Sequence, residues 1–372
     1  MTRARDIADL GGVTTRLDQV GNSDGALSNR NMIINGAMQV AQRGAGPFTN
    51  DSGGYQTVDR FQLEGTMGGS FTLQQASDAP SASGFDKSFK ALAPTGFSSP
   101  SSSASAKIKT SIESQNLQQL LFGTSDAADL TISFWVKATV AGTYILEMYQ
   151  DDATRHLSTS YTISSSNTWE KKTITVVGDV SGTINNDSGS GLSLNWFLAA
   201  GSNFTSGTLA TTWAAVTTAN RAVGQVNAVA SNNDAFFITG VQMEVGPVAT
   251  DFEQEEISTT LSKCQRYFQS FGNSTYTCMS YGSVVAAGIA NYLLNNVVPM
   301  RATPSVSYNN LQHSDGQSGY ALTSLAIATV QSDENNALLI GGQSGNNLTP
   351  FRPVRLEAAN NSAGRIKLDA EL

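Results

Sequence analysis

The sequence contains few charged residues and no basic cluster. Charged residues make up 14% of the 372 residues and the formal net charge is −8, whereas about 25% is typical of soluble domains. A protein that binds nucleic acid needs a surplus of lysine and arginine to neutralise phosphate groups. The composition therefore excludes nucleic acid as an expected partner.

Cysteine and histidine are also scarce. The two cysteines, Cys264 and Cys278, are too few to staple a chain of this size, and Cys264 lies on the apolar face of a predicted helix, where we expect it to pack as a small hydrophobe. The two histidines, His156 and His313, are far apart and have no second histidine or cysteine near them in sequence. We therefore expect no metal site and no cofactor.

Long apolar runs are missing too. No segment approaches the roughly 20 uninterrupted apolar residues of a membrane span, and the opening MTRARDIADLGG has no apolar stretch of the length that a signal peptide needs. We therefore expect a protein that is made in the cytoplasm and does not insert into a membrane.

Short strands separated by turn residues dominate what is present. The 34 glycines and the many serine, threonine and asparagine residues suit frequent turns. Eight mostly alternating segments are predicted to be strands, beginning at Phe71, Lys87, Asp129, Thr143, His156, Trp169, Gly191 and Ala235. Such regular short strands predict two packed antiparallel sheets and a mainly β fold.

Two helices are predicted within this β pattern. Residues 114–122 have leucines at helical spacing, with Ser114 as N-cap. Residues 254–272 form the second helix, because apolar side chains recur every three or four residues at Ile257, Leu261, Cys264, Phe268 and Phe271.

The predicted organisation has four parts. Residues 1–30 form an attachment or trimerising segment, residues 31–253 a β-sandwich, residues 254–272 a linking helix, and residues 273–372 a smaller β-rich tip domain. The N-terminal segment has an apolar stripe that it cannot bury by itself, so it is expected to pair with copies of itself or to dock on another protein.

Several motifs resemble bacteriophage tail-fibre and virion structural proteins. The first group is ITGVQMEVG, ATDFE and KCQRYFQ at residues 238–246, 249–253 and 263–269; the second is NRNMIINGAMQVAQRG and YQTVDRF at residues 29–44 and 55–61; LTISFWVKAT and NTWEKKTITV lie between them at residues 130–139 and 167–176. These motifs occur in order and span about two thirds of the chain. Ala37 and Met38 stand where an acidic-aromatic pair is common, and Phe61 replaces the usual tryptophan.

The resemblance implies a jelly-roll domain like those of carbohydrate-binding modules. It also implies a homotrimeric tail fibre in the virion that attaches to host cells by binding surface polysaccharide, with residues 1–30 anchoring it to other tail or virion proteins. The residues expected to contribute to oligomerisation are Ile7, Leu10, Leu17, Ile257 and Leu261.

Candidate glycan-binding residues are aromatic or lie in a polar loop. Jelly-roll modules bind sugars by stacking aromatic rings on the apolar side of the sugar ring. Trp135, Trp169 and Trp196 fall in predicted strands and are expected in the core. Outside those strands, the candidates are Trp213, Tyr308, His313 and Tyr320, the last three around the polar sequence NNLQHSDGQSGY.

We expect no enzymatic activity, although two alternatives stay open. A glycan depolymerase needs two carboxylates about 5 to 9.5 Å apart, and the adjacent pairs Asp151-Asp152 and Glu255-Glu256 point in different directions on a strand or helix. Gly189-Ser190-Gly191 lacks the strand-to-helix setting of a nucleophile elbow. A virion decoration or connector protein without receptor binding is the second alternative.

Overall fold

The structure is a computed structural model that describes residues 29–50, 53–67, 69–327, 337–345 and 348–372. The chain forms two compact units, with the boundary between Glu255 and Glu256. Ile7, Leu10 and Leu17 of the predicted attachment segment lie outside the described residues.

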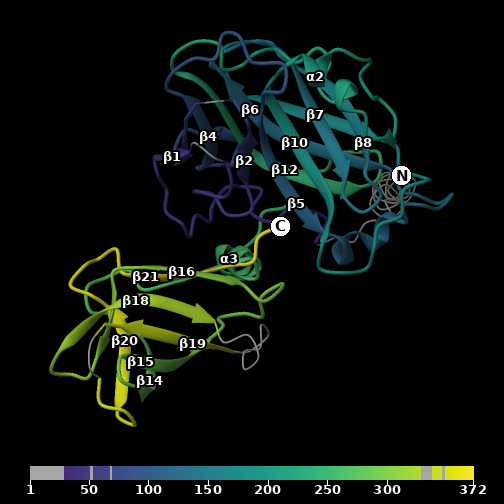
Figure 1. Cartoon of the computed structure of the whole chain (residues 1–372). Helices are drawn as coiled ribbons and strands as arrows, with labels where there is room; N and C mark the ends of the chain where they lie inside the picture. Colours follow the sequence, from purple (N-terminus) through teal and green to yellow (C-terminus); the bar gives the residue numbers. More distant parts are fainter. Residues whose placement is uncertain (1–28, 51–52, 68, 328–336, 346–347) are drawn as a thin grey trace, which may run out of the picture. The chain divides into compact units, whose positions relative to one another are not determined.

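The larger unit is a sandwich of two six-stranded antiparallel sheets (Figure 1). The β1–β9 sheet contains, in spatial order, β1 (Phe48–Asn50), β3 (Phe71–Ala76), β4 (Ser88–Ala93), β12 (Asp234–Val245), β6 (Leu130–Ala138) and β9 (Glu170–Val176). The β2–β11 sheet contains β11 (Ala214–Ala215), β8 (Arg155–Ile163), β7 (Gly142–Gln150), β10 (Ser190–Ala200), β5 (Ser105–Glu113) and β2 (Gln62–Gly65). The chain passes repeatedly from one sheet to the other. The prediction of a mainly β, jelly-roll-type sandwich is confirmed, and all eight predicted strands are present.

The core lies between the sheets, because alternate residues of each strand point inward. Phe134, Tyr161 and Trp196 meet there edge to face, with ring centroids 5.3 Å apart for Phe134 and Tyr161 and 5.7 Å apart for Phe134 and Trp196. Trp196 is fully buried, as predicted. Trp135 and Trp169 are only partly buried, so the prediction that they belong to the core is wrong.

Two of the motifs that carry the sequence resemblance lie side by side where the sandwich begins and ends. The carboxylate of Glu253 accepts hydrogen bonds from the backbone N–H of Asn29 at 2.6 Å and of Asn31 at 2.9 Å. The backbone N–H of Val241 donates to the carbonyl of Gly36 at 2.9 Å, and a side chain at position 36 would overlap the carbonyl oxygen of Val241. Only glycine therefore permits this close approach.

Short helices connect the strands of the larger unit. They are η1 (Ser81–Ser83), η2 (Ser114–Leu120), α2 (Ser202–Thr205) and η3 (Thr218–Asn220). The helix predicted at residues 114–122 is thus a 3-10 helix that ends earlier, with Leu121 in the left-handed conformation and half exposed. Ser114 is not its N-cap, because that position belongs to Glu113.

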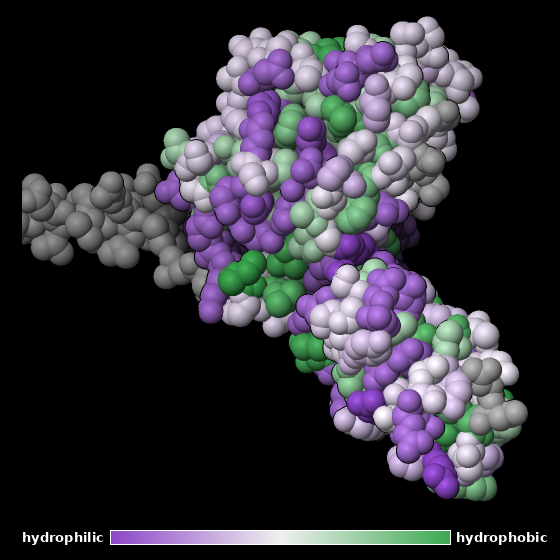
Figure 2. Space-filling view, turned by 90° about the vertical axis from the view of Figure 1, so that its left-hand side faces the viewer, coloured by the Kyte–Doolittle hydropathy of each residue, from purple (hydrophilic) through white to green (hydrophobic). Residues whose placement is uncertain are grey.

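One face of the larger unit has a mixed surface. On the side seen in Figure 2, hydrophilic residues lie among many residues of intermediate hydropathy, and hydrophobic residues form smaller groups between them. Among the described residues, no helix is both long enough and apolar enough to cross a membrane.

The smaller unit combines one helix with a closed barrel and a small sheet. It begins with α3 (Ile257–Gln265). The barrel contains β14 (Cys278–Ala286), β15 (Ile289–Asn295), β19 (Ala337–Ser344), β18 (Gly319–Ile327), β17 (Leu311–Ser314) and β20 (Pro353–Ala358). The small sheet contains β13 (Phe268–Phe271), β21 (Arg365–Asp369) and β16 (Ser305–Asn309).

The prediction of a helix over residues 254–272 is wrong at its C-terminal end. The helix stops at Gln265, and Phe268–Phe271 forms β13, which pairs with β21. Thr260 and Cys264 are the buried residues of α3, whereas Ile257 is 54% exposed and Leu261 is half buried. The prediction that Cys264 packs in the interior is confirmed.

Candidate functional site

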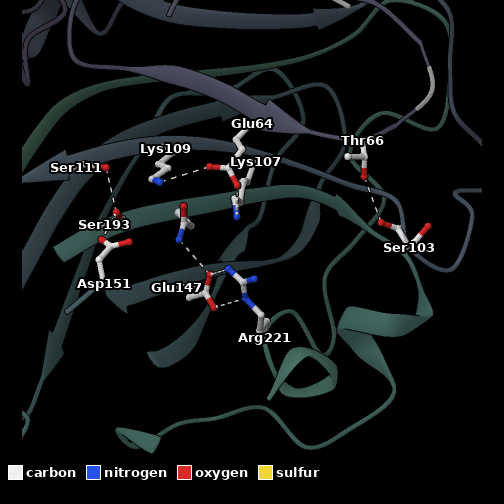
Figure 3. Close-up of polar contacts among 11 residues, drawn as sticks. Glu64, Thr66, Ser103, Lys107, Lys109, Ser111, Glu147, Asp151, Ser193 and Arg221 are labelled. Carbon is white, nitrogen blue, oxygen red and sulfur yellow. Dashed lines mark hydrogen bonds and ion pairs between the residues drawn. The ribbon is translucent and has the colours of Figure 1, made fainter. Parts of the chain in front are cut away.

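The outer face of the β2–β11 sheet, turned away from the core, is lined by polar side chains (Figure 3). In β5, Ile108 and Ile112 belong to the core. The alternation of a strand therefore places Lys107, Lys109 and Ser111 on the outer face.

The strand register brings side chains from three strands together on this face. One row crosses the sheet through Lys109, Asn195 and Glu147, and the next row crosses it through Ser111, Ser193 and Tyr149. We call these six residues, together with Glu64, Lys107 and Asp151, the polar face.

Glu147 is the centre of a buried ionic network on the polar face. Its carboxylate accepts two hydrogen bonds from the guanidinium of Arg221, both at 2.7 Å, and one from Asn195 Nδ2 at 3.1 Å. Nδ1 of His156 lies 3.1 Å from the same carboxylate. Burial by itself would raise the pKa of Glu147, but the hydrogen bonds of His156 and Arg221 and the charge of Arg221 outweigh it and lower the pKa. Glu147 is therefore ionised, and both of its carboxylate oxygens have hydrogen-bonding partners.

Arg221 belongs to a segment that covers one part of this outer face. Ala222 of that segment packs with Ile145 and Phe197 of the sheet, and Phe204 packs against the same cluster. The guanidinium of Arg221 also lies over the ring of Tyr149, 5.3 Å from its centroid. The ionic network thus fastens residues 201–222 to the sheet.

A chain of hydroxyl groups leads to Asp151. Oδ2 of Asp151 accepts hydrogen bonds from the hydroxyls of Ser190 at 2.7 Å and Ser193 at 2.9 Å, and Ser193 Oγ lies 3.0 Å from Ser111 Oγ. Burial raises the pKa of Asp151, and the two serine hydrogen bonds offset only part of this effect. Asp151 is therefore the one carboxylate of the polar face whose pKa is raised.

Two lysines and one glutamate form the other end of the polar face. Nζ of Lys107 lies 2.8 Å from Glu64 Oε1, and Nζ of Lys109 lies 3.5 Å from Glu64 Oε2. Burial opposes ionisation of Glu64, but the two ammonium groups prevail and lower its pKa. Burial also lowers the pKa of Lys107.

The polar face has a buried floor and a more accessible rim. Asn195 is buried, and its Oδ1 atom has no hydrogen-bond partner among the described residues. Glu64, Lys109, Tyr149 and Asp151 are partly exposed. The rim can donate hydrogen bonds, accept them and offer one aromatic ring, which are the interactions that a hydroxyl-rich ligand needs.

The carboxylates near this face have structural partners. Next to Asp151, the side chain of Asp152 accepts hydrogen bonds from Ser114 Oγ at 2.9 Å and from Asn185 Nδ2 at 2.7 Å. Within the described part of the chain, no group of three or more histidine, cysteine, aspartate or glutamate side chains could hold a metal ion.

Trp213 lies away from the polar face. Its Nε1 donates a hydrogen bond to the carbonyl of Val177 at 2.8 Å, and its ring packs edge to face on Phe122 at 5.5 Å. The indole is half buried and packs against the sandwich core, and its contribution to glycan binding stays a prediction.

The other three predicted binding residues lie in the smaller unit. His313 in β17 is fully buried and stacks on Tyr292, whose hydroxyl is hydrogen-bonded to Nδ1 of His313. Tyr320 is the cross-strand partner of His313, and both Tyr320 and Tyr308 pack against the hydrophobic core of the smaller unit. The predicted binding loop is thus a hairpin, and the expectation that His313 meets an external ligand is wrong.

Lys107, Lys109 and Ser111 of the polar face were missed because β5 was not predicted, whereas the polar-face residues of β7 and β10 lie in predicted strands whose outward side chains were not considered as a site. The serine-rich sequence that precedes β5 favours a loop. The alternation in SAKIKTSIE, with Ile108 and Ile112 separated by polar residues, is the signal that could have located Lys107, Lys109 and Ser111.

No protein-family model and no curated protein matches the chain. Among solved structures, the chain is similar to the enzymatically active domain of bacteriophage CBA120 tailspike protein 4, with 15% identity, a TM-score of 0.32 and coverage of 58% of this chain but 21% of that chain. It is also similar to TmCBM61 in complex with β-1,4-galactotriose, with 9% identity, a TM-score of 0.30 and coverage of 58% and 99%. A third is the family 11 carbohydrate-binding module of Clostridium thermocellum in complex with a mixed-linked tetrasaccharide, with 14% identity, a TM-score of 0.29 and coverage of 54% and 95%. At TM-scores this low, the description of the fold depends on the chain's own sheets.

Proposed function

We propose that the chain is a non-catalytic glycan-binding subunit of a bacteriophage tail fibre, which assembles as a homotrimer in the virion and attaches it to host surface polysaccharide. The polar face carries this proposal, because it combines hydroxyl, ammonium and carboxylate groups with the ring of Tyr149 on one side of a rigid sheet. The motifs at residues 29–44 and 238–253 support the phage origin.

The state of the carboxylates supports binding without catalysis. A glycosidase needs one carboxylate that is free to transfer a proton and a second that acts on the sugar or on water. Glu147 is held by Arg221, and Glu64 is paired with two lysines, so Asp151, whose pKa is raised, has no second carboxylate on the polar face that is free to act with it. These carboxylates therefore hold their neighbours in place and orient hydrogen-bond donors.

Binding to an oligosaccharide array would test the proposal. The labelled full-length protein is expected to bind a subset of glycans, and binding to bacterial cells is expected to fall after periodate oxidation of their surface sugars. Lys109→Ala should weaken binding about tenfold, which corresponds to about 1.4 kcal/mol, because it removes a donor at the rim. Lys172→Ala is the control, since Lys172 pairs with Glu170 on the other sheet.

Two outcomes would contradict the proposal. Release of reducing sugars from the bound glycans would show that the protein is a depolymerase. Failure to bind any glycan or any cell would favour a decoration or connector protein.

A further inference from the structure

The outer face of the β1–β9 sheet carries a second cluster, in which lysines alternate with aromatic rings. One row crosses β4, β12 and β6 through Lys90, Phe237 and Lys137, and Trp169 lies beside it at the start of β9. In the next row, Trp135 of β6 is the cross-strand partner of Lys171 of β9. We call Lys90, Trp135, Lys137, Trp169, Lys171 and Phe237 the cationic-aromatic face.

Cation–π contacts and one aspartate fix the geometry of this cluster. Nζ of Lys137 lies 4.6 Å from the ring centroid of Phe237 and 5.4 Å from that of Trp169. Nε1 of Trp169 donates to Oδ1 of Asp78 at 3.0 Å, and Lys137 forms an ion pair with the same carboxylate. The indole is therefore held in one orientation before any ligand arrives, which reduces the entropy that binding costs.

The charge of the cluster is positive, whereas the whole chain carries −8. The cluster contains three lysines, Lys90, Lys137 and Lys171, whereas the contacts described above include one carboxylate, that of Asp78, which forms an ion pair with Lys137. The neighbouring carboxylate of Glu170 accepts hydrogen bonds from Lys172 and from the backbone of Ser164 and Ser165, and strand alternation places it on the other side of β9.

Part of this cluster is accessible. Lys171 is exposed, and Trp135 and Trp169 are partly exposed. β9 is the last strand of its sheet, so Trp169 has a neighbouring strand on one side only. A partly exposed aromatic ring close to the exposed ammonium group of Lys171 is suited to a ligand that has both an apolar ring face and a negative charge.

We propose that the cationic-aromatic face binds acidic saccharides, with Trp169 against one sugar ring, Lys171 near the anionic group of that sugar, and Lys90, three strands away, near the anionic group of another sugar of the same polymer. The ligand class rests on the glycan recognition proposed above, whereas the location, on the opposite sheet, is independent of the polar face. A second site on one subunit would raise the avidity of the particle for a charged polysaccharide.

Binding of three polymers to the full-length protein tests this inference. Polygalacturonate supplies carboxylates, dextran sulfate supplies sulfates, and dextran is the neutral probe. We expect at least one acidic polymer to bind at least about tenfold more tightly than dextran. This preference should shrink when the salt concentration is raised from about 0.05 to about 0.5 M, because added salt shortens the Debye length below about 10 Å and screens the charges.

Matched variants locate the site. Lys171→Gln should weaken acidic-polymer binding several-fold, whereas Lys172→Gln, which removes the same charge at the adjacent position, should leave it unchanged. Trp169→Ala should abolish the preference, and its fold is checked by the unchanged circular dichroism spectrum; Lys171→Gln, at an exposed position, serves if Trp169→Ala does not fold.

Equal binding by Lys171→Gln and Lys172→Gln would overturn the inference, as would the lack of a preference for both acidic polymers over dextran. Neither outcome affects the proposed function, which is tested by Lys109→Ala on the other sheet. Loss of all glycan binding in every assay would instead refute the proposed function and this inference together.

Discussion

At the scale of single residues, the charged side chains on the outer face of the β2–β11 sheet form hydrogen bonds with other residues of the larger unit. Glu147 is fully buried and has hydrogen-bonding contacts with Arg221, Asn195 and His156. A buried ion pair contributes little net stability compared with apolar packing, but removal of one partner leaves a charge without compensation. The network therefore constrains the covering segment more than it strengthens the sandwich.

Glu147→Gln is expected to lower the free energy of unfolding of the larger unit by about 3 kcal/mol. The reason is that Arg221, whose side chain is only 15% exposed, would lose the negative charge that compensates it. Urea unfolding followed by tryptophan fluorescence measures this change, because all four tryptophans precede the boundary at Glu255. Asp126→Asn is the control: Asp126 is exposed and belongs to none of the described ion pairs, and we expect a loss of less than about 1 kcal/mol. Equal losses in the two variants would contradict this account.

The buried His313 makes the stability of the smaller unit depend on pH. Burial lowers the pKa of His313 to about 4, whereas a histidine in an unfolded chain has a pKa of about 6.5. Between these values the unfolded chain binds a proton that the folded unit does not, so the free energy of unfolding falls as the pH drops from about 6.5 to about 4.

Calorimetry at pH 7 and pH 4.5 measures this effect. The melting temperature of the smaller unit should fall further in the wild-type chain than in His313→Gln, because glutamine has no proton to gain. The carboxylates titrate equally in both chains and thus cancel in the comparison. An identical pH dependence of the two chains would show that His313 does not control it.

At the scale of elements, local patterns predicted eight strands of the larger unit, missed β5, and predicted the ends of the helices poorly. The alternation around Phe134 and Trp196 is strong because one side of each strand faces the core. Phe268 and Phe271 also fit the helical spacing of the preceding residues, but pairing of β13 with the distant β21 prevails. A short apolar run fits both periods, and long-range pairing, which the local sequence does not contain, decides between them.

The irregularity in β12 is an element-scale feature with a specific requirement for glycine. The register with β6 shifts between Thr239 and Gln242, and Gly240 has a φ of +60°. A Cβ atom there would lie 2.7 Å from Cζ of Phe85 and 3.0 Å from Cδ1 of Trp135. The bulge thus allows two aromatic rings to pack onto the strand.

Gly240→Ala is expected to destabilise the larger unit by about 2 kcal/mol, since it adds both backbone strain and a steric clash. Gly224→Ala is the matched control, because Gly224 has a φ of +89° but no atom within 4 Å of an added Cβ. The difference between the two variants in urea unfolding isolates the clash with Phe85 and Trp135. A smaller loss in Gly240→Ala than in Gly224→Ala would contradict the proposed packing role.

At the scale of the whole molecule, the chain consists of two units with separate cores. The core of the larger unit and that of the smaller unit are distinct clusters of buried residues. The last strand, β21, pairs within the smaller unit with β13 and β16. Each described sheet is thus formed by strands of a single unit.

Fragments 29–255 and 256–372 are therefore expected to fold separately. Each should unfold cooperatively, because a cut after Glu255 leaves every strand with its partners. Differential scanning calorimetry of the two fragments and of the full chain checks this prediction. A fragment that shows no cooperative transition would establish that its unit depends on the other.

The contact between Glu253 and the backbone of Asn29 and Asn31 has a mechanical consequence. The chain enters and leaves the sandwich at points joined by hydrogen bonds of 2.6 and 2.9 Å. A pull applied between the N-terminal segment and the smaller unit would load this short link first, while the strands of the sandwich remain unstrained. The two outer faces of the larger unit are therefore expected to stay intact while a small force acts on the ends of the sandwich.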